Sequence, residues 1–177
     1  SFGLKYRPHL YAILLAAGGL KRLPELNRLR RRNYDILCEE LAACPALEPI
    51  ETYPESLRGG LLGFMLKYRA EHAGNWQRGA FVRAAAAEGV PIAVDFYKPL
   101  HKTRLFTQGE FAQSGGVMSF YEDWSILPSK CNLTTTERVC EQLVAVQPLT
   151  KVPERFVRQC AAALRKVADA AANIQDL

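Results

Sequence analysis

Lys5 and Arg7 stand in a short glycine-bearing stretch that leads directly into an apolar helical pattern. Gly3 precedes both cations, and Pro8 stands where the helical pattern begins. The first N–H groups of a helix lack backbone partners and the helix dipole is positive at that end, so a phosphate there would meet N–H donors and both cations. Proline suits the first turn because no N–H is needed there. The stretch predicts an anion site, with ordinary surface cations as the alternative.

His101 is the second candidate for chemistry, in the segment Tyr97-Lys98-Pro99-Leu100-His101. Histidine titrates near neutral pH and can hold or transfer a proton. A single loop histidine is either part of a pocket or a solvated bystander, and both readings stay open on the residue alone. The three histidines are scattered without paired carboxylates, and the five cysteines show no C-x-x-C spacing, so we expect no metal site and no disulfide framework.

Composition limits the class of protein. The 177 residues are 49% hydrophobic and 23% charged, which is typical of one soluble globular domain with a buried core. The formal net charge is +5, with arginines gathered between Arg28 and Arg32. Such a run on a helix more often forms a solvated face than a nucleic-acid site, and no base-reading motif accompanies it. We therefore expect no nucleic-acid partner. The apolar runs are too short to span a membrane. Five cysteines, an odd number without C-x-x-C spacing, make a reducing cytosol the simplest setting, so we expect a cytoplasmic location.

The first half of the chain is expected to hold a long helix and two strands. Apolar residues recur at helical spacing from Leu10 to Leu41, and Gly18-Gly19 and Pro24 predict either a hinged helix or two helices end to end. Residues 47–50 form a short strand candidate. Alternation over residues 61–68 predicts a half-buried strand with Leu62, Phe64, Leu66 and Tyr68 on one face.

The second half alternates helices with a strand and a long irregular stretch. Asn75 and Gly89 are expected to cap a helix, and a strand should follow over residues 90–96. Residues 97–123 are irregular, and long loops in compact domains are often functional. Thr134-x-x-Glu137 matches a capping box, predicting a helix through Leu143, and Pro153-Glu154 opens the last helix. The pattern predicts an α+β fold with helices on one face of a small, mainly antiparallel sheet.

The chain resembles the C-terminal domain of the DegT/StrS-type sugar aminotransferases, which use pyridoxal 5′-phosphate (PLP). The resemblance is carried by Gly3 to His9 with the helix that follows, by Phe81 to Gly89, by Tyr97 to His101, and by the last two helices. Its strength lies in the order and coverage of these segments. It implies that residues 1–177 form the single small, C-terminal domain of a fold-type I PLP enzyme, and that the large domain with the PLP lysine is absent from this chain.

The resemblance also implies roles for four residues. Lys5 stands where the family usually has an asparagine that reaches across the dimer to the phosphate of the other subunit's PLP, and Arg7 matches the family's arginine. Tyr97 and His101 match a segment near the substrate pocket. PLP chemistry needs a lysine and an acid that protonates the pyridine nitrogen, and the family has both upstream of Lys5. We therefore expect no catalytic residue in this chain and no activity from it alone.

Lys130 resembles the family's PLP-binding lysine in its local context, Ser125 to Thr134. It lies on the wrong side of the Gly3 to His9 stretch in chain order, lacks the acidic and glycine residues that should follow, and runs into the capping box. We interpret Lys130 as an ordinary loop lysine.

The resemblance therefore implies part of a homodimeric enzyme that moves an amino group from glutamate or glutamine to a keto-sugar or keto-cyclitol. Its expected partners are the large PLP-binding domain or chain and these small molecules. The alternative is a non-catalytic interaction or oligomerisation module derived from the same domain.

Overall fold

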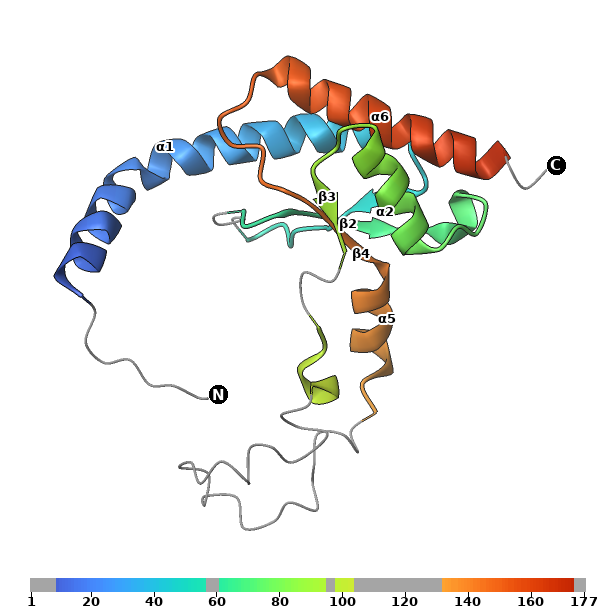
Figure 1. Ribbon diagram of the computed structural model, residues 1–177, viewed down its shortest axis with the longest axis horizontal. Coiled ribbons are helices and arrows are strands. Elements are labelled where there is room, and N and C mark those ends of the chain that lie inside the picture. Colours follow the sequence, from blue (N-terminus) through green and yellow to red (C-terminus); the bar gives the residue numbers. More distant parts are fainter. Residues whose placement is uncertain (1–8, 57–60, 95–97, 104–131, 174–177) are drawn as a thin grey trace, which may run out of the picture.

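The computed structural model describes residues 9–56, 61–94, 98–103 and 132–173. They form an α+β domain, as the sequence predicts (Figure 1). In chain order its elements are α1 (Leu10–Leu41), β1 (Leu47–Pro49), β2 (Phe64–Tyr68), the 3-10 turn η1 (Ala70–His72), α2 (Arg78–Ala87), β3 (Ile92–Ala93), the 3-10 turn η2 (Leu100–Lys102), α5 (Thr134–Gln142), β4 (Leu143–Val146) and α6 (Glu154–Asn173).

Helix α1 is one long helix with Pro24 inside it, which confirms the hinged alternative. Pro24 has no N–H for the preceding turn and its ring crowds the carbonyl there, so the axis bends. Figure 1 shows the N-terminal turns angled away from the rest of α1 and from the body of the domain. His9 caps the start, its Nδ1 accepting a hydrogen bond from the Tyr11 N–H at 3.3 Å.

The four described strands form one antiparallel sheet in the order β1-β2-β4-β3. In β2 the expected alternation is confirmed, because Phe64, Leu66 and Tyr68 are buried. Leu62 was expected on the same face, but it precedes the strand and is exposed. Residues 47–50 and 90–96 were expected to hold strands, and β1 and β3 lie within them.

The sequence pattern missed β4, the strand that joins β2 to β3. Leu143 was expected on the helix that opens at Thr134, but it is the first residue of β4. Arg78 of α2 explains the early end of the helix. Its guanidinium donates to the carbonyls of Cys140, at 2.6 Å, and Leu143, at 2.9 Å, which fixes the junction of helix and strand.

Helix α2 ends as expected and begins differently. Gly89 has φ +90°, and its N–H donates to the Ala86 carbonyl, so it fills the left-handed position after the helix end. The expectation that Asn75 caps the start is wrong. Asn75 has φ +53° within a turn, and Gln77 precedes the first helical residue.

The core lies between the sheet and helices α1, α2 and α6. Helix α6 packs against both α1 and α2, and Figure 1 shows α1 and α6 side by side. The fully buried Leu37, Phe64, Phe81 and Leu164 come from α1, β2, α2 and α6. In α6 the sequence spacing predicts one core-facing apolar stripe, formed by Phe156, Cys160, Leu164, Val167, Ala171 and Ile174. Burial of Cys160, Leu164, Val167 and Ala171 confirms it, and Ile174 lies outside the described residues.

Candidate functional site

His101 is held in place by a carboxylate from another element. It lies in η2 and is only 7% exposed, and its Nε2 is 2.8 Å from Oε1 of Glu137 in α5. A carboxylate only accepts, so the ring donates its Nε2–H, which leaves Nδ1 as the nitrogen that can accept a proton or a ligand hydrogen bond. The substrate-side histidine expected from the sequence therefore has a fixed orientation.

Glu137 also binds the neighbour of His101. Lys102 Nζ lies 2.6 Å from Glu137 Oε2, so both carboxylate oxygens are engaged. Hydrogen bonds from Lys102 and then from His101 lower the pKa of Glu137 below its ordinary value. The cluster of His101, Lys102 and Glu137 thus joins η2 to α5, two segments far apart in the sequence.

The capping-box expectation for Glu137 needs correction. The helix does begin at Thr134, but its N-cap residue is Leu133, whose side chain makes no capping hydrogen bond. Glu137 lies in the first turn of α5, where the helix dipole favours its negative charge. Its two carboxylate oxygens contact His101 and Lys102.

Three of the predicted site residues, Lys5, Arg7 and Tyr97, and the lookalike Lys130 lie outside the described residues. The structure therefore places only His101 of the expected set. Sequence reasoning missed Glu137 as a site residue because its spacing from Thr134 already had a local explanation.

The described lysines do not suit covalent attachment of a cofactor ring, which needs a buried, neutral amine. Lys67, Lys102 and Lys166 each pair with a glutamate. The other three in the described ranges, Lys21, Lys98 and Lys151, are exposed.

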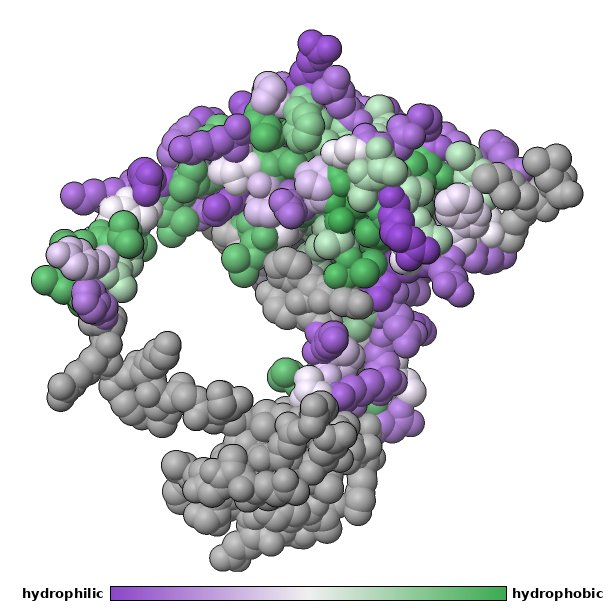
Figure 2. All heavy atoms as spheres, in the orientation of Figure 1, coloured by the Kyte–Doolittle hydropathy of each residue, from purple (hydrophilic) through white to green (hydrophobic). Residues whose placement is uncertain are grey.

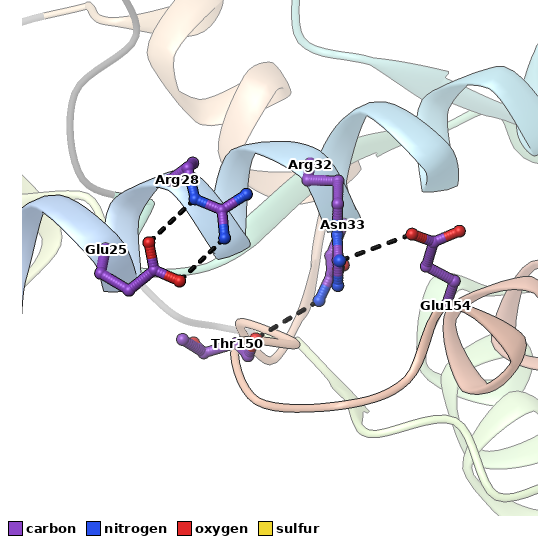
Figure 3. A network of polar contacts seen from close by, with 6 residues as sticks. All are labelled: Glu25, Arg28, Arg32, Asn33, Thr150 and Glu154. Carbon is purple, nitrogen blue, oxygen red and sulfur yellow. Dashed lines mark hydrogen bonds and ion pairs between the residues drawn. The ribbon is translucent and has the colours of Figure 1, made fainter.

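Arg28 and Arg32, from the arginine-rich part of α1, make contacts with other residues of this chain (Figure 3). Arg28 pairs with Glu25 of the same helix at 2.8 Å. Arg32 donates to Oδ1 of Asn33 at 3.1 and 2.9 Å and lies 3.4 Å from Glu154 at the start of α6. This arrangement accounts for these arginines as internal contacts of the domain.

Asn33 is the centre of this network and was missed by the sequence pattern. It is fully buried, and its Nδ2 donates to the Leu149 carbonyl and, at 3.5 Å, to the Thr150 carbonyl. Arg30 adds a contact to the Thr150 hydroxyl at 3.1 Å. Helix α1 is thereby fixed to the connection between β4 and α6.

Neither a metal cluster nor a membrane helix is found where the structure can be described. Within residues 9–56, 61–94, 98–103 and 132–173, no three His, Cys, Asp or Glu side chains gather as metal ligands. No helix in these ranges is both long enough and apolar enough to cross a bilayer. The cysteines within them, Cys38, Cys44, Cys140 and Cys160, are free thiols.

A sequence model of the DegT/DnrJ/EryC1/StrS aminotransferase family matches residues 2–144. No curated protein matches the chain significantly.

Solved aminotransferases share the fold at low identity. An aminotransferase from Psychrobacter cryohalolentis is 16% identical with a TM-score of 0.68, and the match covers 97% of this chain and 41% of that one. DesI, solved with its TDP-sugar product, is 19% identical with a TM-score of 0.65, covering 89% and 35%. The sugar aminotransferase Spr1654 from Streptococcus pneumoniae, described as putative and solved in a PMP form, is 18% identical with a TM-score of 0.58, covering 86% and 33%. The chain thus spans well under half the length of these proteins.

Proposed function

Because the chain belongs to the DegT/DnrJ/EryC1/StrS aminotransferase family, we propose that it is the small, C-terminal domain of a PLP-dependent aminotransferase. The main support is the family match over residues 2–144. The fold match adds to it, because it covers 33% to 41% of the length of three solved aminotransferases. The proposed reaction moves an amino group from glutamate or glutamine to a keto-sugar or keto-cyclitol.

The solved relatives support the cofactor and the substrate class of this proposal. Spr1654 was solved in both PLP and PMP forms, and DesI was solved with a TDP-sugar product. PLP, when bound, supplies the electron sink for the chemistry at the amino-bearing carbon. In this proposal, the residues of this chain bind and position the cofactor phosphate and the substrate.

Lys5 and Arg7 are the proposed contacts to the cofactor phosphate. Each offers a positive charge immediately before α1, and charge-assisted hydrogen bonds to phosphate are among the stronger polar contacts in proteins. We assign them to the PLP of the other subunit in a homodimer. The lysine at position 5, where the family usually has asparagine, would act as a point charge.

Tyr97 and His101 are the proposed substrate contacts. The 2.8 Å contact with Glu137 orients the His101 ring, so that Nδ1 can accept a hydrogen bond or hold a proton beside a hydroxyl-rich substrate. In this proposal the ring-binding lysine and acid belong to the large domain. The chain alone should then have no transaminase activity.

Native purification tests this function. We expect the large domain, on the same polypeptide or on a second one, to co-purify with this chain and to hold about one PLP per copy. Intact mass and cofactor absorbance measure both quantities. A native species that consists of this chain alone and contains no PLP would refute the proposal.

The second candidate is a non-catalytic interaction module derived from this domain. The same family match and fold match are compatible with it. It differs in one measurable respect: loss of Lys5 or Arg7 would leave cofactor binding by any partner unchanged.

A further inference from the structure

Helix α5 carries Glu137, the partner of His101, but it contributes no buried side chain to the core. None of its nine residues is buried. Figure 2 shows mainly hydrophilic residues over α5, and Figure 1 shows the helix extending from the sheet away from α1 and α6. Among the described residues, the position of α5 therefore depends mainly on polar contacts at its two ends.

Arg78 holds the C-terminal end of α5. The N–H of Leu143 closes the last helical hydrogen bond, to the Val139 carbonyl. The carbonyls of Cys140 and Leu143 lie beyond that bond, and the Arg78 guanidinium donates to both, at 2.6 and 2.9 Å. The last turn of α5 contains no basic residue of its own, so Arg78 also supplies a positive charge at the negative end of the helix dipole.

The position of Arg78 in its own helix supports this role. Arg78 is the first residue of α2, and the first turn of α2 contains no acidic side chain. The dipole of α2 is positive at that end, so a cation there is unfavourable for α2 itself. The two carbonyls at the end of α5 offset that effect.

Glu137 is coupled to this anchored end because it lies one helical turn before Cys140. Residues three apart in a helix are neighbours on its surface. Glu137 contacts His101 Nε2 at 2.8 Å and Lys102 Nζ at 2.6 Å. Fraying or displacement of α5 would move the carboxylate away from both. One short helix thus connects the guanidinium of Arg78 to the imidazole of His101.

We propose that Arg78 is a positioning residue for the substrate side of the site: it fixes α5, and α5 holds Glu137 against His101. The substrate part of this inference rests on the proposed function, whereas the link from Arg78 to His101 rests on contacts within this chain. Without the guanidinium, the ring should lose its fixed orientation, and Nδ1 would no longer be held toward a substrate hydroxyl.

Proton NMR of the complete native protein tests the link. The Nε2–H of His101 is bonded to a carboxylate in a ring that is only 7% exposed, so its proton should exchange slowly with water and give its own resonance. Arg78→Met keeps the aliphatic stem and removes the guanidinium. We expect this proton to exchange at least about tenfold faster in Arg78→Met, because the lost charge-assisted contacts held α5 closed. Glu137→Ala should abolish the slow exchange and thereby assign the resonance.

Arg83→Met is the matched control, because Arg83 lies on the same helix and is exposed. It should leave the exchange rate unchanged. Arg78→Lys keeps the charge but lacks the planar fork that serves two carbonyls, so its rate should fall between those of the parent and Arg78→Met. If Arg78→Met does not fold, Arg78→Lys is compared with Arg83→Lys. A parent-like rate in folded Arg78→Met, or equal rates in the two lysine variants, would overturn the proposal.

The two half-reactions give a readout that a general structural defect would not reproduce. Stopped-flow absorbance separates the step with the amino donor from the step with the keto-sugar. Only the sugar is rich in hydroxyl groups, so Arg78→Met should raise KM for the sugar by about tenfold and change the donor step by less than about twofold. Equal losses in both steps would overturn the positioning role. A slow proton that depends on Arg78, in protein that catalyses neither step, would support the positioning of His101 and refute the proposed function.

Discussion

Glu137 and His101 are joined at 2.8 Å although 36 residues separate them, and Glu137 also pairs with Lys102 at 2.6 Å. One carboxylate thereby orients the imidazole and ties η2 to α5. The ring is almost buried, so its orientation depends on this contact more than on solvent. Helix α5 thus determines the ring orientation of His101, which the sequence resemblance implies to lie near the substrate pocket.

Glu137→Gln should remove a pH-dependent part of the stability. The pKa of Glu137 is lowered from 4.5 by Lys102 and His101, so its contribution is complete above about pH 4.5 and is lost as the pH falls through the lower folded-state value. Parent and variant should therefore differ most near neutral pH and converge in acid. Urea unfolding across this range measures the difference.

Glu141→Gln is the matched control, because Glu141 lies on the same helix and is exposed. A constant gap between the parent and Glu137→Gln at every pH would contradict the ion pairs as its source.

Asn33→Ala should be the most destabilising polar substitution on α1. It leaves the carbonyls of Leu149 and Thr150 without their donor and removes the acceptor of Arg32, in a fully buried site. An unsatisfied buried group costs about 1 to 3 kcal/mol. Chemical denaturation measures the loss, and Glu39→Ala at an exposed position on the same helix should change stability by less than about 0.5 kcal/mol. If Asn33→Ala and Glu39→Ala lowered the free energy of unfolding equally, the hydrogen-bond network of Asn33 would not be the source of the loss.

Two glycine substitutions with equally open surroundings should act in opposite directions. Neither Gly19 nor Gly89 has an atom within 4 Å of an added Cβ, but only Gly89 has a positive φ, of +90°. Gly19→Ala should stabilise this chain by about 0.5 to 1 kcal/mol through helix propensity. Gly89→Ala should destabilise it by about 1 to 2 kcal/mol through backbone strain. Thermal unfolding that moves in the same direction for both would refute this reading.

The sequence predicted most elements because their patterns are local. Alternation identified β2, the spacing of buried residues identified α6, and Gly89 marked the end of α2. Strand β4 was not predicted because Leu143 to Val146 continues an apolar pattern that begins in α5. The contacts of Arg78 mark the point where the helix ends. That contact joins residues more than sixty positions apart, which no local pattern can reveal.

The sequence likewise predicted one part of the candidate site and missed another. His101 was found from its segment, but its partner Glu137 was assigned to a capping box, since Thr134-x-x-Glu137 satisfies that motif in sequence. Asn33 looked like an ordinary polar residue in an arginine-rich helix, and only the path of the chain after β4 makes it central.

Lys5→Ala and Arg7→Ala should weaken cofactor binding in the complete enzyme. Loss of one charge-assisted phosphate contact, worth about 1.5 to 3 kcal/mol, should raise the PLP dissociation constant by about one to two orders of magnitude. The unfolding temperature of the PLP-free enzyme should stay nearly unchanged, because both residues precede the core-forming part of α1. Fluorescence titration with PLP measures the constants, and parent-like affinity in both variants would remove the phosphate role.

Transfer of an amino group by the purified native protein tests the central claim most directly. We would record the PLP absorbance after adding L-glutamate or L-glutamine, and then after adding a nucleotide-linked keto-sugar or a keto-cyclitol. The account predicts that an amino donor converts the PLP form to the PMP form and that an acceptor restores it, with an aminated product detected by mass spectrometry. An absorbance that responds to neither amino donor, in protein shown to contain PLP and the large domain, would contradict it.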